Sequence, residues 1–130
     1  MTKNFTIITR RPTPNELLDK LTHIFPAFLS IWERDDNLFV NKDGTYSVHG
    51  VFSVFSTFLR DNFQDIEEQK LERLFEYVEE CVKTDVHSES GVSNAACTCF
   101  LENLTGEGEL SKNILRFMGE KSKEYFDKRN

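Results

Sequence analysis

The hydrophobic residues of this chain recur mostly at spacings of three and four, which is the pattern of amphipathic helices. The clearest helix start is Thr13-Pro14-Asn15-Glu16, where Thr13 and Glu16 can form a capping box and Pro14 suits the first helical position. Six stretches follow the helical pattern. We expect them to begin near Pro14, Pro26, Ser47, Asp65, Val92 and Leu110.

The ends of these helices are set by capping and turn residues. Asp65 is the expected N-cap of the fourth helix, which runs to about Thr84. Gly106 is expected to close the fifth helix in a left-handed conformation. Hydrophobic residues from Leu110 to Tyr125 mark one sixth helix, which ends in the basic tail at residues 128–130. Between the second and third helices, an Asn-x-Asp-Gly turn also allows a short β-hairpin near residues 38–47, of marginal stability.

Helices of this number joined by short connections predict an all-α fold, with residues 1–130 as a single domain. About six helices would pack as successive antiparallel hairpins. The third and fourth helices resemble the fifth and sixth at an offset of 42 to 43 residues, a period typical of HEAT or armadillo units. The pattern fits a HEAT-like stack and an irregular bundle equally well.

The amino-acid composition disfavours several classes of protein. The chain has 12 Phe, enough for an aromatic core, and a net charge of −6, which disfavours direct binding to nucleic acid or an anionic membrane. No run approaches the roughly 18 apolar residues of a membrane span, and the N-terminus does not resemble a signal peptide. We therefore expect a cytoplasmic protein, with Cys81, Cys97 and Cys99 as reduced thiols.

The sequence holds no convincing catalytic, metal or cofactor motif. Residues 41–44 resemble part of a calcium loop, but the register places Phe39 and Gly50 where carboxylates are needed, so we predict only a turn. His23, His49 and His87 have no metal-ligand spacing. We expect a protein that is not an enzyme and needs no cofactor; a hydrolase using dispersed carboxylates is a weaker alternative.

Charge is unevenly distributed along the chain. Residues 61–109 hold thirteen acidic side chains against three basic ones, a net of −10, whereas residues 1–60 carry +1 and residues 110–130 carry +3. Five glutamates of the fourth helix form a stripe opposite its hydrophobic face. Like charges at this spacing destabilise a helix, so the stripe predicts either a solvated face or a docking surface for a basic partner. The candidate binding residues are Glu68, Glu72, Glu76, Glu79, Glu80, Asp85, Glu89 and the aromatics Trp32 and Tyr77, although core packing is the favoured alternative for Trp32.

Three features stand out beside the charge pattern: residues 94–104 (NAACTCFLENL), the Phe25-Pro26 break and the aromatic-rich residues 50–55. Together they resemble small all-helical bacterial proteins, some of which are immunity proteins of contact-dependent or polymorphic toxin systems. The resemblance implies a cytoplasmic inhibitor that forms a 1:1 complex with a toxin. Nuclease toxins present basic surfaces to phosphates, so we predict an acidic face that covers the substrate surface of an RNase-like toxin. The alternative is a non-catalytic helical-repeat adaptor or regulatory binding protein.

Overall fold

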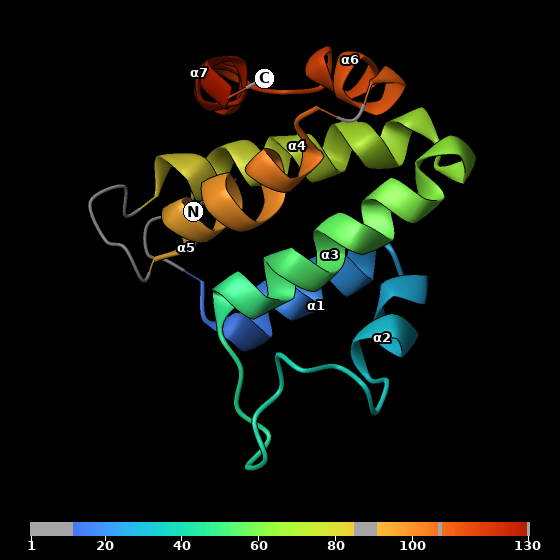
Figure 1. Cartoon of the computed structure of the whole chain (residues 1–130), viewed down its shortest axis with the longest axis vertical. Helices are drawn as coiled ribbons and strands as arrows, with labels where there is room; N and C mark the ends of the chain where they lie inside the picture. Colours follow the sequence, from blue (N-terminus) through green and yellow to red (C-terminus); the bar gives the residue numbers. More distant parts are fainter. Residues whose placement is uncertain (1–11, 85–90, 107, 130) are drawn as a thin grey trace, which may run out of the picture.

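The structure is a computed structural model that describes residues 12–84, 91–106 and 108–129, and these residues form helices and turns without a β-strand (Figure 1). Helix α1 (Pro14–Ile24) begins with the predicted capping box: Glu16 N–H donates to Thr13 Oγ1 at 3.1 Å, and Thr13 N–H donates to Glu16 Oε1 at 2.9 Å. Helix α2 (Ala27–Trp32) follows directly after Pro26. The prediction of an all-α fold is confirmed.

Helices α3 (Val48–Asn62) and α4 (Glu68–Lys83) are the longest and cross the molecule in opposite directions (Figure 1). Ser47 caps α3 by accepting from Gly50 N–H at 3.1 Å. The predicted cap of α4 is wrong, because Asp65 lies in a short 3₁₀ turn that links the two helices. The residue before α4 is Glu67, whose side chain makes no capping hydrogen bond.

The fifth helical stretch is irregular. It begins as α5 (Val92–Ala95), widens into a π-helix over Ala96–Leu101 and tightens into a 3₁₀ turn over Glu102–Leu104. Side chains satisfy carbonyls inside this stretch, since Thr98 Oγ1 donates to the Asn94 carbonyl at 2.8 Å and Asn103 Nδ2 to the Cys99 carbonyl at 2.7 Å. Gly106 ends the stretch with φ 74°, as the sequence predicted.

The prediction of one continuous sixth helix is wrong. The stretch forms two helices, α6 (Glu109–Leu115) and α7 (Glu120–Arg129), separated by a turn at residues 116–119. The predicted β-hairpin near residues 38–47 is also absent from the described chain. A tight turn takes its place, in which Asn41 N–H donates to the Thr45 carbonyl at 2.8 Å and Gly44 adopts φ 88°.

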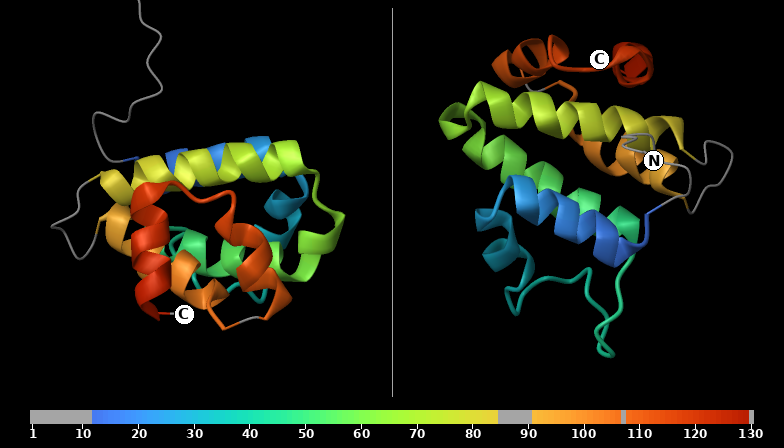
Figure 2. Two further views of the ribbon diagram at one scale, coloured as in Figure 1. Left: turned by 90° about the horizontal axis from the view of Figure 1, so that it is seen from above. Right: turned by 180° about the vertical axis from the view of Figure 1, so that it is seen from behind.

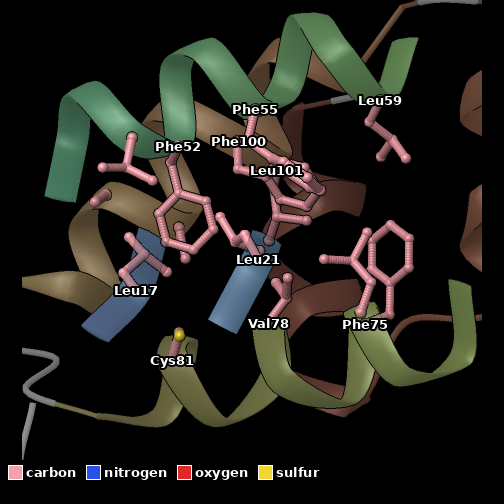
Figure 3. Close-up of a cluster of buried hydrophobic side chains, with 14 of the residues drawn as sticks. Leu17, Leu21, Phe52, Phe55, Leu59, Phe75, Val78, Cys81, Phe100 and Leu101 are labelled. Carbon is pink, nitrogen blue, oxygen red and sulfur yellow. The ribbon is translucent and has the colours of Figure 1, made fainter. Parts of the chain in front are cut away.

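The hydrophobic core lies between α1, α3, α4 and the π-helical segment and is built mainly from leucine and phenylalanine (Figure 3). Phe100 of the π-helix is fully buried, and its ring centroid lies 5.6 Å from Phe52, 5.7 Å from Phe55 and 5.9 Å from Phe75. Tilted rings at such distances add attraction beyond simple burial. Phe100 therefore joins α3 to α4 through the centre of the molecule.

The arrangement is an irregular bundle rather than a stack of equal repeats. α3 and α4 have 15 and 16 residues, whereas α5 has 4 and α6 has 7, so the two halves proposed from the sequence differ in form. α6 and α7 lie on the side of α4 away from α3, and α1 lies along α4 on another side (Figures 1 and 2). In the described ranges, every helix is too short or too polar to cross a bilayer.

Candidate interaction surface

The outer side of α4 forms the floor of an open groove of about 560 Å³. Lys20 and Ile24 of α1 lie on one side of this groove, and residues 117–119 of the α6–α7 turn lie on the other. The floor is contributed by α4 residues Arg73, Phe75, Glu76, Tyr77, Glu79 and Glu80. A smaller hollow of about 450 Å³, lined by Glu72, Glu76, Arg116 and Phe117, adjoins it. We call the open groove and this hollow together the α4 groove.

The stripe of glutamates predicted on α4 exists, but part of it binds the chain itself. Glu68 accepts a hydrogen bond from Arg116 Nη2 at 2.7 Å, and both side chains are exposed. The Arg116 guanidinium also lies 4.4 Å from the centroid of the Phe117 ring. An exposed ion pair of this kind contributes only about 1 kcal/mol or less to the stability of the fold. It nevertheless engages the Glu68 carboxylate within the chain.

Glu79 has a structural role that the sequence did not reveal: it caps the N-terminus of α7. Its Oε2 accepts from Lys121 N–H at 2.9 Å, and its Oε1 accepts from Ser122 N–H at 2.9 Å and from Ser122 Oγ at 2.8 Å. A side chain at Gly119 would collide with Glu79, since an added Cβ would lie 2.4 Å from the Glu79 carboxyl carbon. Glu79 thus supplies the cap that Gly119, the residue before α7, lacks.

The pKa of Glu79 reflects this capping. Partial burial by itself raises the pKa, but the hydrogen bonds from Lys121 and Ser122, together with the positive charge of Lys83, outweigh it and lower the pKa below the usual 4.5. A carboxylate held in this way is ionised at neutral pH. It is already fully engaged with α7 and is not available to a partner.

Tyr77 and Glu80 are also partly engaged within the protein. Tyr77 is half-buried, its hydroxyl donates to the Cys81 thiol, and Lys20 Nζ lies 5.5 Å from its ring centroid. Burial raises the pKa of Tyr77, as do the neighbouring Cys81 and Glu16, so the hydroxyl stays protonated. Glu80 lies 3.4 Å from Lys83 Nζ on the same helix.

Glu72 and Glu76 are the members of the stripe that remain open. Both are exposed, and neither forms a hydrogen bond or ion pair with the rest of the described chain. They lie one helical turn apart and both line the hollow beside Phe117. Phe117 is half-buried and its ring stacks on Phe75 at 6.4 Å, so the groove presents an aromatic surface next to the two carboxylates.

The other predicted binding residues lie elsewhere. Trp32 is buried, with 5% of its surface exposed, and packs against Phe28 and Tyr46; its core role is therefore confirmed, and it does not contribute to the α4 groove. Asp85 and Glu89 lie outside the described residues. Lys20 and the α6–α7 turn were not predicted to flank α4, because only the break between α6 and α7 brings that turn there.

The cysteines and histidines do not form a catalytic or metal-binding cluster in the described chain. Cys81 is completely buried, and burial raises the pKa of its thiol to about 12, with the nearby Glu80 charge adding to the effect and the Tyr77 hydrogen bond opposing it. Cys97 and Cys99 are half-buried and reduced. His49 Nε2 lies 2.9 Å from Asn94 Oδ1, joining α3 to α5. No group of three His, Cys, Asp or Glu residues that could hold a metal ion occurs among residues 12–84, 91–106 and 108–129.

Residues 18–130 match a family described as a domain of unknown function, DUF7674. The match includes α4, the α6–α7 turn and the whole of the groove between them. Neither the curated proteins nor the solved structures contain a match to this chain.

Proposed function

Since the chain belongs to DUF7674, a family of unknown function, we propose its role from the surface it presents: it is a non-catalytic protein that binds a basic partner at the α4 groove. The observation that carries the proposal is the placement of Glu72 and Glu76, two exposed carboxylates beside the aromatic ring of Phe117. Carboxylates around an aromatic contact are a favourable combination for a positively charged protein surface, because charge guides the encounter and the ring supplies buried area.

We propose further that the partner is a nuclease toxin and that this protein is its immunity protein. The resemblance of residues 94–104 and 50–55 to small helical immunity proteins supports this identity, as does the net charge of −10 across residues 61–109. A ribonuclease needs a basic surface to bind the phosphate backbone of its RNA substrate. An acidic groove that covers this surface would exclude RNA without any chemistry by the inhibitor. The expected complex is a 1:1 heterodimer in the cytoplasm.

The proposal predicts that a gene adjacent to the gene of this protein encodes the toxin domain, and this domain is the partner used in the test. The two purified proteins should form a 1:1 complex by calorimetry, and addition of this protein should stop RNA cleavage by the toxin. The variant Glu72→Lys/Glu76→Lys should bind about tenfold or more weakly at low salt, with the difference shrinking as salt increases. These residues suit the test because neither supports the fold through a hydrogen bond or ion pair with another residue that the structure describes.

A matched control separates a local effect from a change of net charge. The variant Asp61→Lys/Asp127→Lys changes the net charge equally, at exposed positions that do not line the groove. It should bind within about threefold of the wild-type protein, since distant charges are screened. Equal weakening by the two double variants would contradict docking at the α4 groove. Binding without inhibition of cleavage would instead favour the adaptor role.

A further inference from the structure

The exposed large hydrophobic side chains of the described chain are concentrated in one short region. They are Leu29, 40% exposed, Leu38, 92% exposed, and Phe39, 49% exposed. Leu29 lies on α2, and the other two lie on the segment that connects α2 to α3 and projects from the body of the molecule (Figure 1). Single exposed leucines are ordinary, but a local concentration is typical of an interaction site.

The connecting segment, residues 33–47, is held by its own hydrogen bonds, although it contains neither helix nor strand. Asn37 Nδ2 donates to the Trp32 carbonyl at 2.8 Å, and Asn37 Oδ1 accepts from Phe39 N–H at 3.0 Å. Near its tip, Asp43 Oδ1 accepts from Thr45 N–H at 3.0 Å and from Thr45 Oγ1 at 2.6 Å. These hydrogen bonds, the side-chain one foremost, lower the pKa of Asp43 below its usual value.

The segment is also anchored to the body of the protein. Near its C-terminal end, the Tyr46 ring lies 5.1 Å from the Trp32 ring, and the Tyr46 hydroxyl donates to Asn15 Oδ1 of α1. In its middle, Phe39 packs directly on Gly50 of α3, where an added Cβ would lie 2.9 Å from Phe39 Cβ. Long loops fixed in this way are uncommon and frequently functional. The exposure of Leu38 therefore belongs to an ordered loop.

Beside this loop lies a hollow of about 510 Å³ whose lining combines apolar and acidic side chains. The apolar part comes from Leu18, Leu29, Trp32, Val40 and Tyr46. Glu33 and Asp35 contribute exposed carboxylates to the same lining. Arg34 also lines the hollow, but its charge is balanced by Asp36, whose Oδ2 lies 2.9 Å from Arg34 Nη2. The lining thus keeps a net negative charge.

We propose that α2 and the following loop form a second docking site, which takes a segment of a partner protein carrying lysine or arginine beside apolar side chains. The stem of such a basic side chain can lie against the apolar lining, while its charged end meets Glu33 and Asp35. Leu29 and Leu38 lose water-exposed surface when the partner's apolar side chains cover them. The site does not depend on the α4 groove, with which it shares no lining residue.

Charge decides between this occupant and a second copy of the chain. Two copies meeting at this site would bring Glu33 and Asp35 of each protomer together, and like charges brought together in an interface are unfavourable. A basic segment meets no such repulsion. The wild-type protein should therefore be monomeric by sedimentation, and a dimer that Leu38→Ser converts to monomer would overturn the proposal.

The experiment uses the one tryptophan of the chain, Trp32, which lines the hollow and reports its occupation by fluorescence. The probe is a short blocked peptide of alternating lysine and leucine, titrated at low salt. We expect a saturable change in Trp32 emission. The same peptide with glutamate in place of lysine, or serine in place of leucine, should bind at least about tenfold more weakly.

Two variants locate the binding. Leu29→Ser and Leu38→Ser change exposed side chains, and each should weaken the lysine–leucine peptide about fivefold to tenfold while leaving the helical circular dichroism unchanged. The control, Glu72→Gln/Glu76→Gln, alters only the α4 groove and should leave the affinity unchanged. The proposal is overturned if the peptide does not change Trp32 emission, or if both leucine variants bind it as tightly as wild type does. It is also overturned if only the control variant binds the peptide more weakly, because the peptide then binds at the α4 groove.

Discussion

The capping of α7 by Glu79 gives a sharp test of how the C-terminal part of the fold is held. Replacing Glu79 with alanine removes the acceptors of Lys121 N–H, Ser122 N–H and Ser122 Oγ at once. These donors lie in the first turn of α7, where backbone N–H groups have no partner within the helix. Because α7 buries Phe126 completely in the core, loosening its start affects the stability of the whole domain.

The expected loss follows from the number and kind of these hydrogen bonds. Removal of an N-cap side chain costs about 0.5 to 2 kcal/mol, and a hydrogen bond to a charged group about 1.5 to 3 kcal/mol. Glu79 is only partly buried, so water replaces some of what is lost, and we expect about 2 kcal/mol for Glu79→Ala. Glu79→Gln keeps an oxygen for Ser122 but turns an amide N–H toward Lys121 N–H, so about 1 kcal/mol is expected.

Urea denaturation followed by circular dichroism measures these losses as changes in the free energy of unfolding. The matched control is Glu76→Ala, an exposed glutamate on the same helix without a hydrogen bond to α7, which should change stability by about 0.5 kcal/mol or less. The reasoning is refuted if Glu79→Ala and Glu76→Ala are equally stable. It is also refuted if Glu79→Gln is as stable as wild type.

The pH dependence of this difference has a defined sign. The pKa of Glu79 is lowered in the folded protein, despite the opposing effect of burial, by hydrogen bonds from Lys121 and Ser122 and by the charge of Lys83. Its stabilising contribution is therefore complete above the unfolded pKa, near 4.5, and is lost as pH falls through the lower folded value. The difference in the free energy of unfolding between wild type and Glu79→Gln should be largest at pH 7 and should shrink below about pH 4. A gap that stays constant to pH 2 would contradict ionised Glu79 as its source.

Two further predictions concern Gly50 and the cysteines. Gly50→Ala should lower the free energy of unfolding by about 1 kcal/mol because the new Cβ meets Phe39 Cβ. In a Phe39→Gly background, which removes that Cβ, the same change should stabilise by up to about 1 kcal/mol, as alanine favours a helix. Additive effects in this double-mutant cycle would argue against the contact. In the folded protein at pH 8, Cys81 should resist a thiol reagent because it is buried and its thiol has a pKa of about 12, while the half-buried Cys97 and Cys99 should react first. Mass spectrometry of the labelled peptides measures the order, and labelling of Cys81 as quickly as the other two would contradict its burial.

The sequence predicted those parts of the fold whose causes are local. The capping box of Thr13 and Glu16, the helix end at Pro26 and the hydrophobic seam of α4 all depend on residues within a few positions of one another, and each appears in the structure. The break between α6 and α7 has a distant cause, because Glu79 caps α7 from more than forty positions away. Periodicity along a helix carries no signal for a cap donated by another helix.

The predicted docking stripe shows the same limit for function. In the sequence, a segment with a net charge of −10 followed by one of +3 predicts either a solvated acidic face or a docking surface for an external basic partner. The structure places the basic segment against the acidic one: Arg116 pairs with Glu68, and Glu79 holds the start of α7. The first partner of the α4 stripe is therefore the chain's own C-terminal part, and only Glu72 and Glu76 stay open beside Phe117. A variant that reversed every glutamate of α4 would unfold α7 and disturb any surface at the same time, so a loss of binding would mean nothing. Restricting the charge reversal to Glu72 and Glu76 makes binding and folding separately measurable.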